Sequence, residues 1–311
     1  SDGSLLWSRE IGGRVRAVST ARFAGQERPA VVAGGTSATL YAFDAEGSEL
    51  WTFAMPRYKS AGVITTLFPA DLDADGADEV VAGTESWRYY AFGADGAEIW
   101  RVESVRMSTI GAAADLDGDG ADEVVAGTEY HSWPVYDSDG RHMFSYAPRT
   151  GPGANDVAIA DLTGDGSPEI VFAGLDSFVH AIDNRGQLLW KFGTGDSVSA
   201  VAPLTAGDAT MAAGSRSFNL YGFAGDGSVV WRRDLGSPVA DVASFMTADG
   251  ERVVATTDSG AVVVADAADG TLLGRAQLMR GGLVAVAADL DGDGSQEPVL
   301  SSADGKITAL K

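Results

Sequence analysis

The stretch VHAIDNRGQLLWKF, residues 179–192, decides the fold because the same phrase returns along the whole chain. Residues 40–53 read LYAFDAEGSELWTF, again with an apolar segment, a D-x-x-G turn and a second segment that reaches a Trp. The Trp position of this phrase falls at Trp7, Trp51, Trp100, Phe144, Trp190, Trp231 and, in a degenerate copy, Gly274. The intervals are 44, 49, 44, 46, 41 and 43 residues, so the chain is an internal repeat with a period in the forties.

Each repeat has the pattern of four short strands. In residues 155–192 the candidate strands are NDVAIADL, PEIVFAG, FVHAID and QLLWKF, which are rich in Val, Ile, Phe and Ala and are separated by Gly and Asp turns. No segment has a convincing amphipathic-helix period. Four strands per unit and seven units predict an all-β, seven-bladed β-propeller. We expect a single domain, 1–311, with blades at approximately 14–51, 60–100, 104–144, 155–190, 198–231, 239–274 and 282–311 plus 1–7.

The two ends of the chain match an internal blade when they are joined. Residues 307–311 followed by 1–7 read ITALKSDGSLLW, which has the length and pattern of VHAIDNRGQLLW at 179–190. The sequence therefore predicts that the N-terminal strand completes the last blade and closes the ring, which would remove exposed sheet edges. Trp7 and its equivalents are expected to be blade-packing residues.

Composition excludes several classes of function. The 22 basic and 44 acidic residues give a net charge of −22, which disfavours nucleic acid or an anionic membrane as a partner. There is no Cys, so zinc–thiolate sites and thiol nucleophiles are excluded. No apolar run is long enough to span a membrane. No signal peptide is visible at Ser1, and the abrupt start is compatible with a module of a larger protein.

Four loops carry carboxylates at calcium-binding spacing. They read DLDADGADE (71–79), DLDGDGADE (115–123), DLTGDGSPE (161–169) and DLDGDGSQE (289–297), with acids at positions 1, 3, 5 and 9 and Gly at position 6, except that Thr163 replaces the acid at position 3 of the third loop. We expect these loops to join the first and second strands of their blades and to bind calcium. The predicted ligands are Asp71, Asp73, Asp75, Glu79, Asp115, Asp117, Asp119, Glu123, Asp161, Thr163, Asp165, Glu169, Asp289, Asp291, Asp293 and Glu297. Without metal they would be four ordinary Asp-Gly turns.

These loops resemble the FG-GAP or VCBS repeats of integrin-type and bacterial extracellular propellers, and the phrases at 40–53 and 179–192 resemble PQQ-like repeats. Together the two patterns cover essentially the whole chain, although blades one, five and six depart from the calcium pattern. The resemblance implies a propeller fold, bound calcium and an extracellular or periplasmic location. It implies no activity, because one fold serves many functions.

A second group of residues gathers on loops expected at the opposite, calcium-free face. The turns TESWRYY (84–90) and TEYHSWP (128–134) are bulky where blades six and seven have small residues, and the neighbouring blade-linking loops are cationic. Such asymmetry in a near-symmetric repeat predicts a binding site on blades two to four. The predicted substrate-binding residues are Arg57, Lys59, Trp87, Tyr89, Arg106, Glu129, Trp133, Arg149 and Asn155. Local packing of variable loops is the alternative explanation.

Aromatic rings with Arg and Asn suit an acidic polysaccharide or oligosaccharide, and these loops loosely resemble those of seven-bladed lyases that release rhamnose-linked glucuronate. A polysaccharide lyase must neutralise the uronate carboxylate and supply a base and an acid. The predicted catalytic residues are His131, Tyr130, Tyr58 and Arg88, with His131 as base or acid, either Tyr as its partner, and Arg57, Arg88, Arg106 and Arg149 as the carboxylate clamp.

Three alternatives remain open at this level. Glu85 with Glu129 or Asp156 could form the carboxylate pair of a glycosidase. A non-catalytic, calcium-stabilised glycan-binding or adhesion module fits the repeats equally well. A quinone-dependent dehydrogenase is disfavoured because no cofactor-facing acid cluster is evident.

Overall fold

The computed structural model describes residues 5–148, 153–279, 281–290 and 292–310. Within these ranges the regular structure is entirely β-strand, and they contain no helix. The chain divides into two compact units, residues 2–154 and 155–311, called here the N-terminal and C-terminal units.

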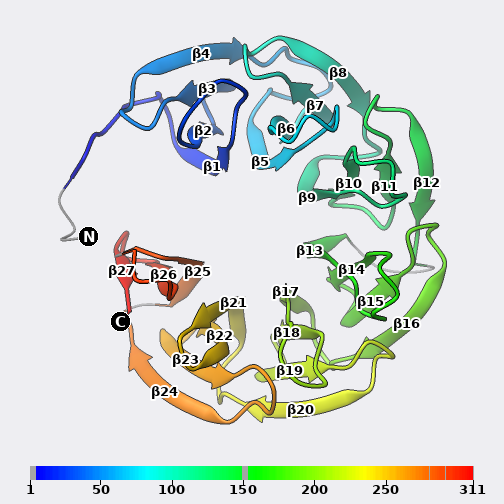
Figure 1. The fold of residues 1–311 in the computed structure, drawn as a ribbon, viewed down its shortest axis with the longest axis vertical. Helices are drawn as coiled ribbons and strands as arrows, with labels where there is room; N and C mark the ends of the chain where they lie inside the picture. The colour runs from blue at the N-terminus through cyan, green and yellow to red at the C-terminus, as the bar shows by residue number, and fades with distance from the viewer. Residues whose placement is uncertain (1–4, 149–152, 280, 291, 311) are drawn as a thin grey trace. The chain divides into compact units, whose positions relative to one another are not determined.

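The N-terminal unit contains three antiparallel sheets of four strands in chain order, which follow one another in Figure 1. The first is β1 (Val15–Ala21), β2 (Ala30–Gly35), β3 (Thr39–Phe43) and β4 (Glu49–Ala54); the second is β5 (Ile64–Ala70), β6 (Glu79–Thr84), β7 (Arg88–Phe92) and β8 (Glu98–Glu103); the third is β9 (Ser108–Ala114), β10 (Glu123–Thr128), β11 (Trp133–Tyr136) and β12 (His142–Tyr146).

The C-terminal unit continues the same pattern through the fourth to seventh sheets. They comprise β13 (Ala154–Ala160), β14 (Glu169–Gly174), β15 (Phe178–Ile182) and β16 (Leu188–Gly193); β17 (Val198–Pro203), β18 (Met211–Ser215), β19 (Asn219–Phe223) and β20 (Val229–Asp234); β21 (Val239–Thr247), β22 (Gly250–Thr257), β23 (Ala261–Asp266) and β24 (Leu272–Gln277); and β25 (Gly282–Ala288), β26 (Glu297–Ser302) and β27 (Ile307–Ala309).

The predicted fold class, an all-β seven-bladed β-propeller with antiparallel blades, is confirmed. In the described part of the chain the last sheet has three strands, and residues 5–14 are in no strand. Residues 1–4 and 311 lie outside the described residues, so completion of the last blade by the N-terminal segment stays a prediction.

The position of a strand within its sheet determines its burial. Every residue of the second strands β6, β10 and β14 is buried. Fourth strands such as β8 and β16 alternate between covered and exposed positions. The sequence EVVAGT therefore lacks alternation because a strand covered on both faces has no polar side to present.

Neighbouring sheets are joined by the Trp residues of the repeated phrase. The Trp51 indole donates from Nε1 to the Ala94 carbonyl at 2.9 Å, in the last hairpin of the next sheet. Equivalent donations run from Trp7 to Ala45, Trp100 to Ser138, Trp190 to Gly225 and Trp231 to Ala267, at 2.8–3.0 Å. The prediction that these Trp residues pack blades together is confirmed, and Trp7 makes with the first sheet the contact that a preceding fourth strand would make.

Each of these indoles lies against the glycine of the hairpin between the third and fourth strands of the sheet that it contacts. Gly227 has φ +82°, and a Cβ built on it would lie 2.5 Å from the Trp190 ring. Glycine is required at this position for two reasons, because the backbone is left-handed and because the indole occupies the space of a side chain.

We predict that Gly227→Ala lowers the free energy of unfolding more than a matched change without the indole contact. Gly236→Ala is the control, since Gly236 has φ +73° but an added Cβ there would have no neighbouring atom within 4 Å. The control should lose about 1–2 kcal/mol through backbone strain alone. Gly227→Ala should lose about 1–3 kcal/mol more through overpacking, measured by denaturant unfolding. Equal losses would show that the indole contact does not constrain this glycine.

Candidate functional site

The first and second strands of four sheets are joined by the acidic loops, as predicted, and the loops share one backbone pattern. In the 115–123 loop, Asp115 accepts N–H donation from Gly118 at 2.6 Å and from Gly120 at 3.0 Å. Glu123 accepts from the Leu116 N–H at 2.8 Å. The 71–79, 161–169 and 289–297 loops repeat the donations to the first Asp and to the last Glu.

Two of these loops gather three carboxylates around one point. Oxygens of Asp71, Asp73 and Glu79 lie within 4.8 Å of one another, and so do those of Asp115, Asp117 and Glu123. Burial raises the pKa of Glu79, and that of Glu123 to about 7, with a further contribution from the neighbouring aspartates. An all-oxygen set with such mutual repulsion fits a hard cation such as calcium.

The other two loops have the same backbone pattern, and only the 161–169 loop lacks one of the acids. Backbone donation, first from Gly166, holds the pKa of Asp161 below its usual range, while Thr163 replaces one carboxylate. Asp291, a predicted ligand in the 289–297 loop, lies outside the described residues. The 161–169 loop therefore has one carboxylate fewer than the 71–79 and 115–123 loops.

At the opposite ends of the second strands, the structure brings together seven of the predicted site residues, which we call the aromatic–cation ladder. Its members are Tyr58, Lys59, Trp87, Arg88, Arg106, Tyr130 and His131, all in the N-terminal unit. The Arg88 guanidinium lies 3.7 Å from the centre of the Tyr58 ring. The ammonium of Lys59 and the guanidinium of Arg106 lie 4.6 and 5.1 Å from the Trp87 ring centre.

The ladder continues across the third sheet. Arg106 also lies 5.8 Å from the Tyr130 ring centre, and the rings of Tyr130 and His131 are 3.9 Å apart. Segments from two blade-linking loops and two strand-connecting turns thus meet at one continuous surface. Contacts of this kind hold cations over π faces without removing their charge.

Trp87 adopts a conformation that its turn imposes. Its φ is +66°, and the corresponding turns place Ala38, Ser177 and Phe218 in the same left-handed region. Every non-glycine residue in this region incurs a cost of about 1–3 kcal/mol, so the strain belongs to the turn and not to the Trp. The two cations that lie against its ring make Trp87 a candidate functional residue.

One acid anchors the ladder. Glu103, at the end of β8, accepts from the Tyr58 hydroxyl at 2.8 Å and forms an ion pair with Lys59. The Lys59 contact, followed by the Tyr58 hydrogen bond, lowers the pKa of Glu103. Sequence analysis missed Glu103, because an acid at the end of an exposed strand is indistinguishable there from ordinary surface charge.

Two predicted substrate contacts are wrong. Trp133 is fully buried on β11 and packs against Tyr146, with ring centres 5.7 Å apart, so its face cannot stack on a sugar. Tyr89 is also fully buried, and its hydroxyl donates to the main-chain carbonyls of Ile110 and Gly127. Burial raises the pKa of Tyr89 well above its usual range. Both residues belong to the core.

The remaining predicted residues are dispersed. Arg57 is exposed beside the ladder, in a shallow hollow of about 280 Å³ with Tyr58, Lys59 and Ser60. Glu129 is exposed, whereas Glu85 pairs with Arg16 at 2.7 Å. The proposed glycosidase pair of Glu85 and Glu129 therefore has one member engaged by a cation. Arg149 lies outside the described residues.

In the C-terminal unit, Asn155 donates from Nδ2 to the Val198 carbonyl at 2.7 Å, which joins the first strands of two sheets. It lines a polar cavity of about 460 Å³ that also contains Asp156 and Asp241. Each Asp accepts a backbone N–H from the next sheet, Val201 and Ala285 respectively. Burial raises the pKa of Asp156 to about 7 and that of Asp241 to about 6. These carboxyls bridge sheets, a role for Asp241 that no sequence motif marked.

Comparisons with known proteins support the repeat assignment. Residues 175–311 match a PQQ-type family model described as outer membrane protein assembly factor BamB, and residues 115–172 match the FG-GAP-like repeat. Each covers less than half of the chain. No curated protein sequence matches significantly. Among the described residues, no helix is long and apolar enough to cross a membrane.

Solved structures show the same fold at low identity. BBS1N, crystallised in complex with ARL6DN, is 11% identical with a TM-score of 0.72, over 96% of this chain and 92% of that one. Sqt1 of Saccharomyces cerevisiae is 13% identical with a TM-score of 0.75, over 94% and 84% of the two chains. These similarities show the propeller fold alone.

We predict that Asp156 makes stability fall as pH rises. Its folded pKa of about 7 exceeds the ordinary Asp value, so its contribution is fully present near pH 4 and is lost as pH passes through about 7. Asp156→Asn keeps an acceptor for Val201 and should therefore raise Tm relative to wild type at pH 8 but not near pH 4. Asp208→Asn, at an exposed position, is the charge control. A pH-independent difference for Asp156→Asn would contradict the prediction.

Proposed function

We propose that this chain is a non-catalytic, calcium-stabilised interaction module that binds an acidic segment of a partner protein through the aromatic–cation ladder. The single observation that carries the proposal is the continuous stack of three cations and four aromatic or imidazole rings across the second and third sheets.

The local charge supports this function. Lys59, Arg88 and Arg106 contribute three positive charges and Glu103 one negative charge, so this part of the ladder has a net charge of 3 − 1 = +2 on a chain of net charge −22. Rings hold the long cationic side chains in place and reduce the entropy lost when a carboxylate binds. Repulsion from the rest of the surface would restrict an acidic partner to this region.

The shape of the surface favours association over catalysis. The hollow next to the ladder is shallow, at about 280 Å³, and two of the large aromatics expected to line a substrate cleft are in the core. The fold neighbour BBS1N was crystallised in a complex with another protein, ARL6DN, which agrees with a binding role for such propellers.

Calcium has a structural role in this proposal. The 71–79 and 115–123 loops would hold one ion each through their clustered carboxylates, the 289–297 loop has the same set of acids in its sequence, and the 161–169 loop, with Thr163 in place of a carboxylate, would bind more weakly. Each ion would neutralise a group of like charges at one end of a buried second strand. An extracellular or periplasmic location, where calcium is abundant, is part of the same proposal.

A uronate-specific lyase is the second candidate. It is favoured by the ring contact between Tyr130 and His131, with the Arg106 guanidinium 5.8 Å from the Tyr130 ring. Arg106 would neutralise a uronate carboxylate, while Tyr130 and His131 would exchange protons with the sugar. Tyr58 is less suited to this role because its hydroxyl already donates to Glu103.

We predict that Arg106→Ala weakens binding of a Glu-rich peptide by about tenfold or more, because charge-assisted contacts contribute about 1.5–3 kcal/mol each. Binding should also become less sensitive to salt. Arg185→Ala, an exposed cation on the β15–β16 hairpin, is the matched control and should bind like wild type. Both affinities are measured by titration calorimetry with the peptide, and the titration is repeated with an oligouronate as a second ligand. Equal peptide affinities for both variants would show that the ladder does not bind the peptide.

We predict that calcium raises Tm and that a chelator lowers it. At a free concentration one hundred times Kd, each occupied site contributes about 2.7 kcal/mol. Asp117→Asn should reduce the calcium-dependent shift, whereas Asp139→Asn, an exposed turn acid outside the loops, should not. An unchanged Tm on chelation would show that these loops are metal-free turns.

The lyase candidate makes its own prediction. Uronate polysaccharides should yield an unsaturated product with ultraviolet absorbance, and His131→Ala should abolish it while Tm stays near the wild-type value, because His131 is outside the buried core. Absence of product across a panel of such polysaccharides, with intact binding of the acidic peptide, would leave the interaction module as the function.

A further inference from the structure

One junction between sheets lacks the indole that the other junctions of its unit retain. On β24, Gly274 takes the position that Trp231 holds on β20 and Trp190 on β16. The paired residue on the third strand is small where the fourth strand carries Trp and larger where the fourth strand carries Gly. Trp190 faces Ala181 and Trp231 faces Gly222, whereas Gly274 faces Val264. A Val on the third strand does not replace an indole that would reach the next sheet.

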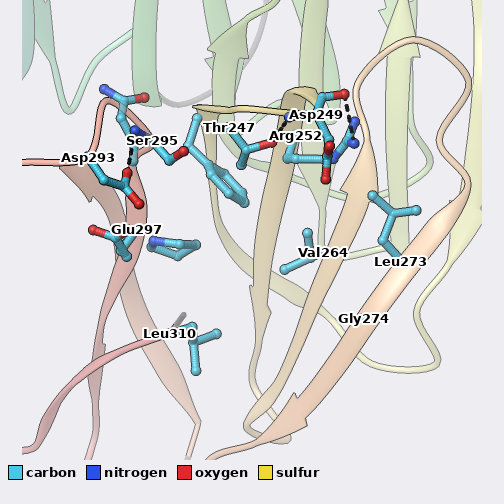
Figure 2. Close-up of a pocket in the computed structure, with 13 residues that line it drawn as sticks. Thr247, Asp249, Arg252, Val264, Leu273, Gly274, Asp293, Ser295, Glu297 and Leu310 are labelled. Atoms are coloured by element: carbon cyan, nitrogen blue, oxygen red, sulfur yellow. Dashed lines mark hydrogen bonds between the residues drawn. The ribbon is translucent and has the colours of Figure 1, made fainter. Parts of the chain in front are cut away.

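A cavity of about 440 Å³ lies at this junction, between the sixth and seventh sheets of the C-terminal unit. Its apolar wall is formed by Phe245, Val264, Leu273, Pro298 and Leu310, together with the bare backbone of Gly274. In Figure 2, Val264, Leu273 and Leu310 lie below the polar residues Thr247, Asp293 and Ser295. A volume of this size is within the range of small-molecule sites.

The polar rim of the cavity is acidic. Asp249, Asp293 and Glu297 all line it, and because Asp293 and Glu297 are also predicted calcium ligands, Asp249 is the carboxylate that stays available beside a calcium-loaded loop. The one cation among the lining residues, Arg252, is paired with Asp266 at 2.6 Å. Arg252 also donates to the Asp249 carbonyl at 3.1 Å, which fixes the guanidinium beside the opening. A bound group with an apolar ring and a positive end would match wall and rim together.

We propose that this cavity is a binding site for a small aromatic amine with a ring system of indole size. The ring would occupy the space that Trp190 and Trp231 fill with their own side chains at the preceding junctions, and the amine would face the acidic rim. Apolar cavities left by missing side chains bind aromatic molecules of matching size, because the ring regains the packing contacts that the cavity lacks.

The test uses tryptamine, indole and indole-3-acetate as probes at fixed calcium concentration. Tryptamine should raise Tm and bind at least as tightly as indole, and indole-3-acetate should cause no shift, because its carboxylate would meet the acidic rim. A response to none of them, or an equal response to the acetate, would overturn the proposal.

Variants locate the site. Val264→Ala with Gly274→Trp recreates the Ala–Trp pair of the fourth sheet, and this double variant should have a higher Tm than wild type and an affinity for tryptamine reduced about tenfold or more. The single variant Gly274→Trp provides a second filled cavity if the double variant does not fold. Undiminished tryptamine binding in a folded, filled variant would place the ligand elsewhere and overturn the assignment.

Trp231→Ala is the positive control, since it opens an equivalent space at the preceding junction, and indole should raise its lowered Tm. A peptide containing Trp distinguishes the source of the ring. If the peptide binds wild type and neither tryptamine nor indole does, the cavity is a docking point for another chain and the small-ligand assignment is wrong.

Discussion

The contact between an indole and the next sheet's hairpin glycine is the constraint on which the packing of each unit depends. The indole fills the interface, and its N–H donates to a hairpin carbonyl at 2.8–3.0 Å, so a buried donor is satisfied as the sheets meet. The receiving glycine must be left-handed and bare, as Gly96 and Gly227 are. Within one copy of the phrase, the glycine contacts the Trp of the preceding sheet, and the Trp contacts the glycine of the next sheet. Each copy therefore contributes to two interfaces, so the sequence repeats with the same period as the sheets.

Because each copy of the phrase contributes to two interfaces, the fold could be predicted from the sequence, whereas part of the site could not. Each phrase specifies a local hairpin and a contact between sheets, so seven copies are enough to indicate a propeller. The turn between β10 and β11 carries no such phrase. It has the same length as the turn between β6 and β7, because the Thr84 hydroxyl donates to the Arg88 carbonyl and the Thr128 hydroxyl to the Ser132 carbonyl, each four positions on. Trp133 is therefore the equivalent of Tyr89, and both lie on the third strand in the core, which residue type alone did not reveal.

The second strands separate two opposite charge environments. Glu79 begins β6 at the acidic loop, and Thr84 ends it beside the ladder turn. Six residues of extended chain span about 17–20 Å, which exceeds the Debye length of about 8 Å at physiological ionic strength. The clustered carboxylates and the stacked cations of the same sheet therefore interact only weakly through solvent. A chain of net charge −22 can maintain a locally cationic surface because its acidic loops lie at the other strand ends.

Departures from a structural repeat carry information about function when they cost stability. Trp87 places a large side chain at a turn position where Ala38 and Ser177 are small and Phe218 is also large, but Trp87 has two cations against its ring. Gly274 does the reverse, since it removes a large side chain from a junction where Trp190 and Trp231 fill the space. The Trp87 ring supports two cations, and the missing indole at Gly274 leaves an apolar wall under an acidic rim. Each position therefore differs from its equivalents in what it contacts, which is a pair of cations at Trp87 and an open cavity at Gly274.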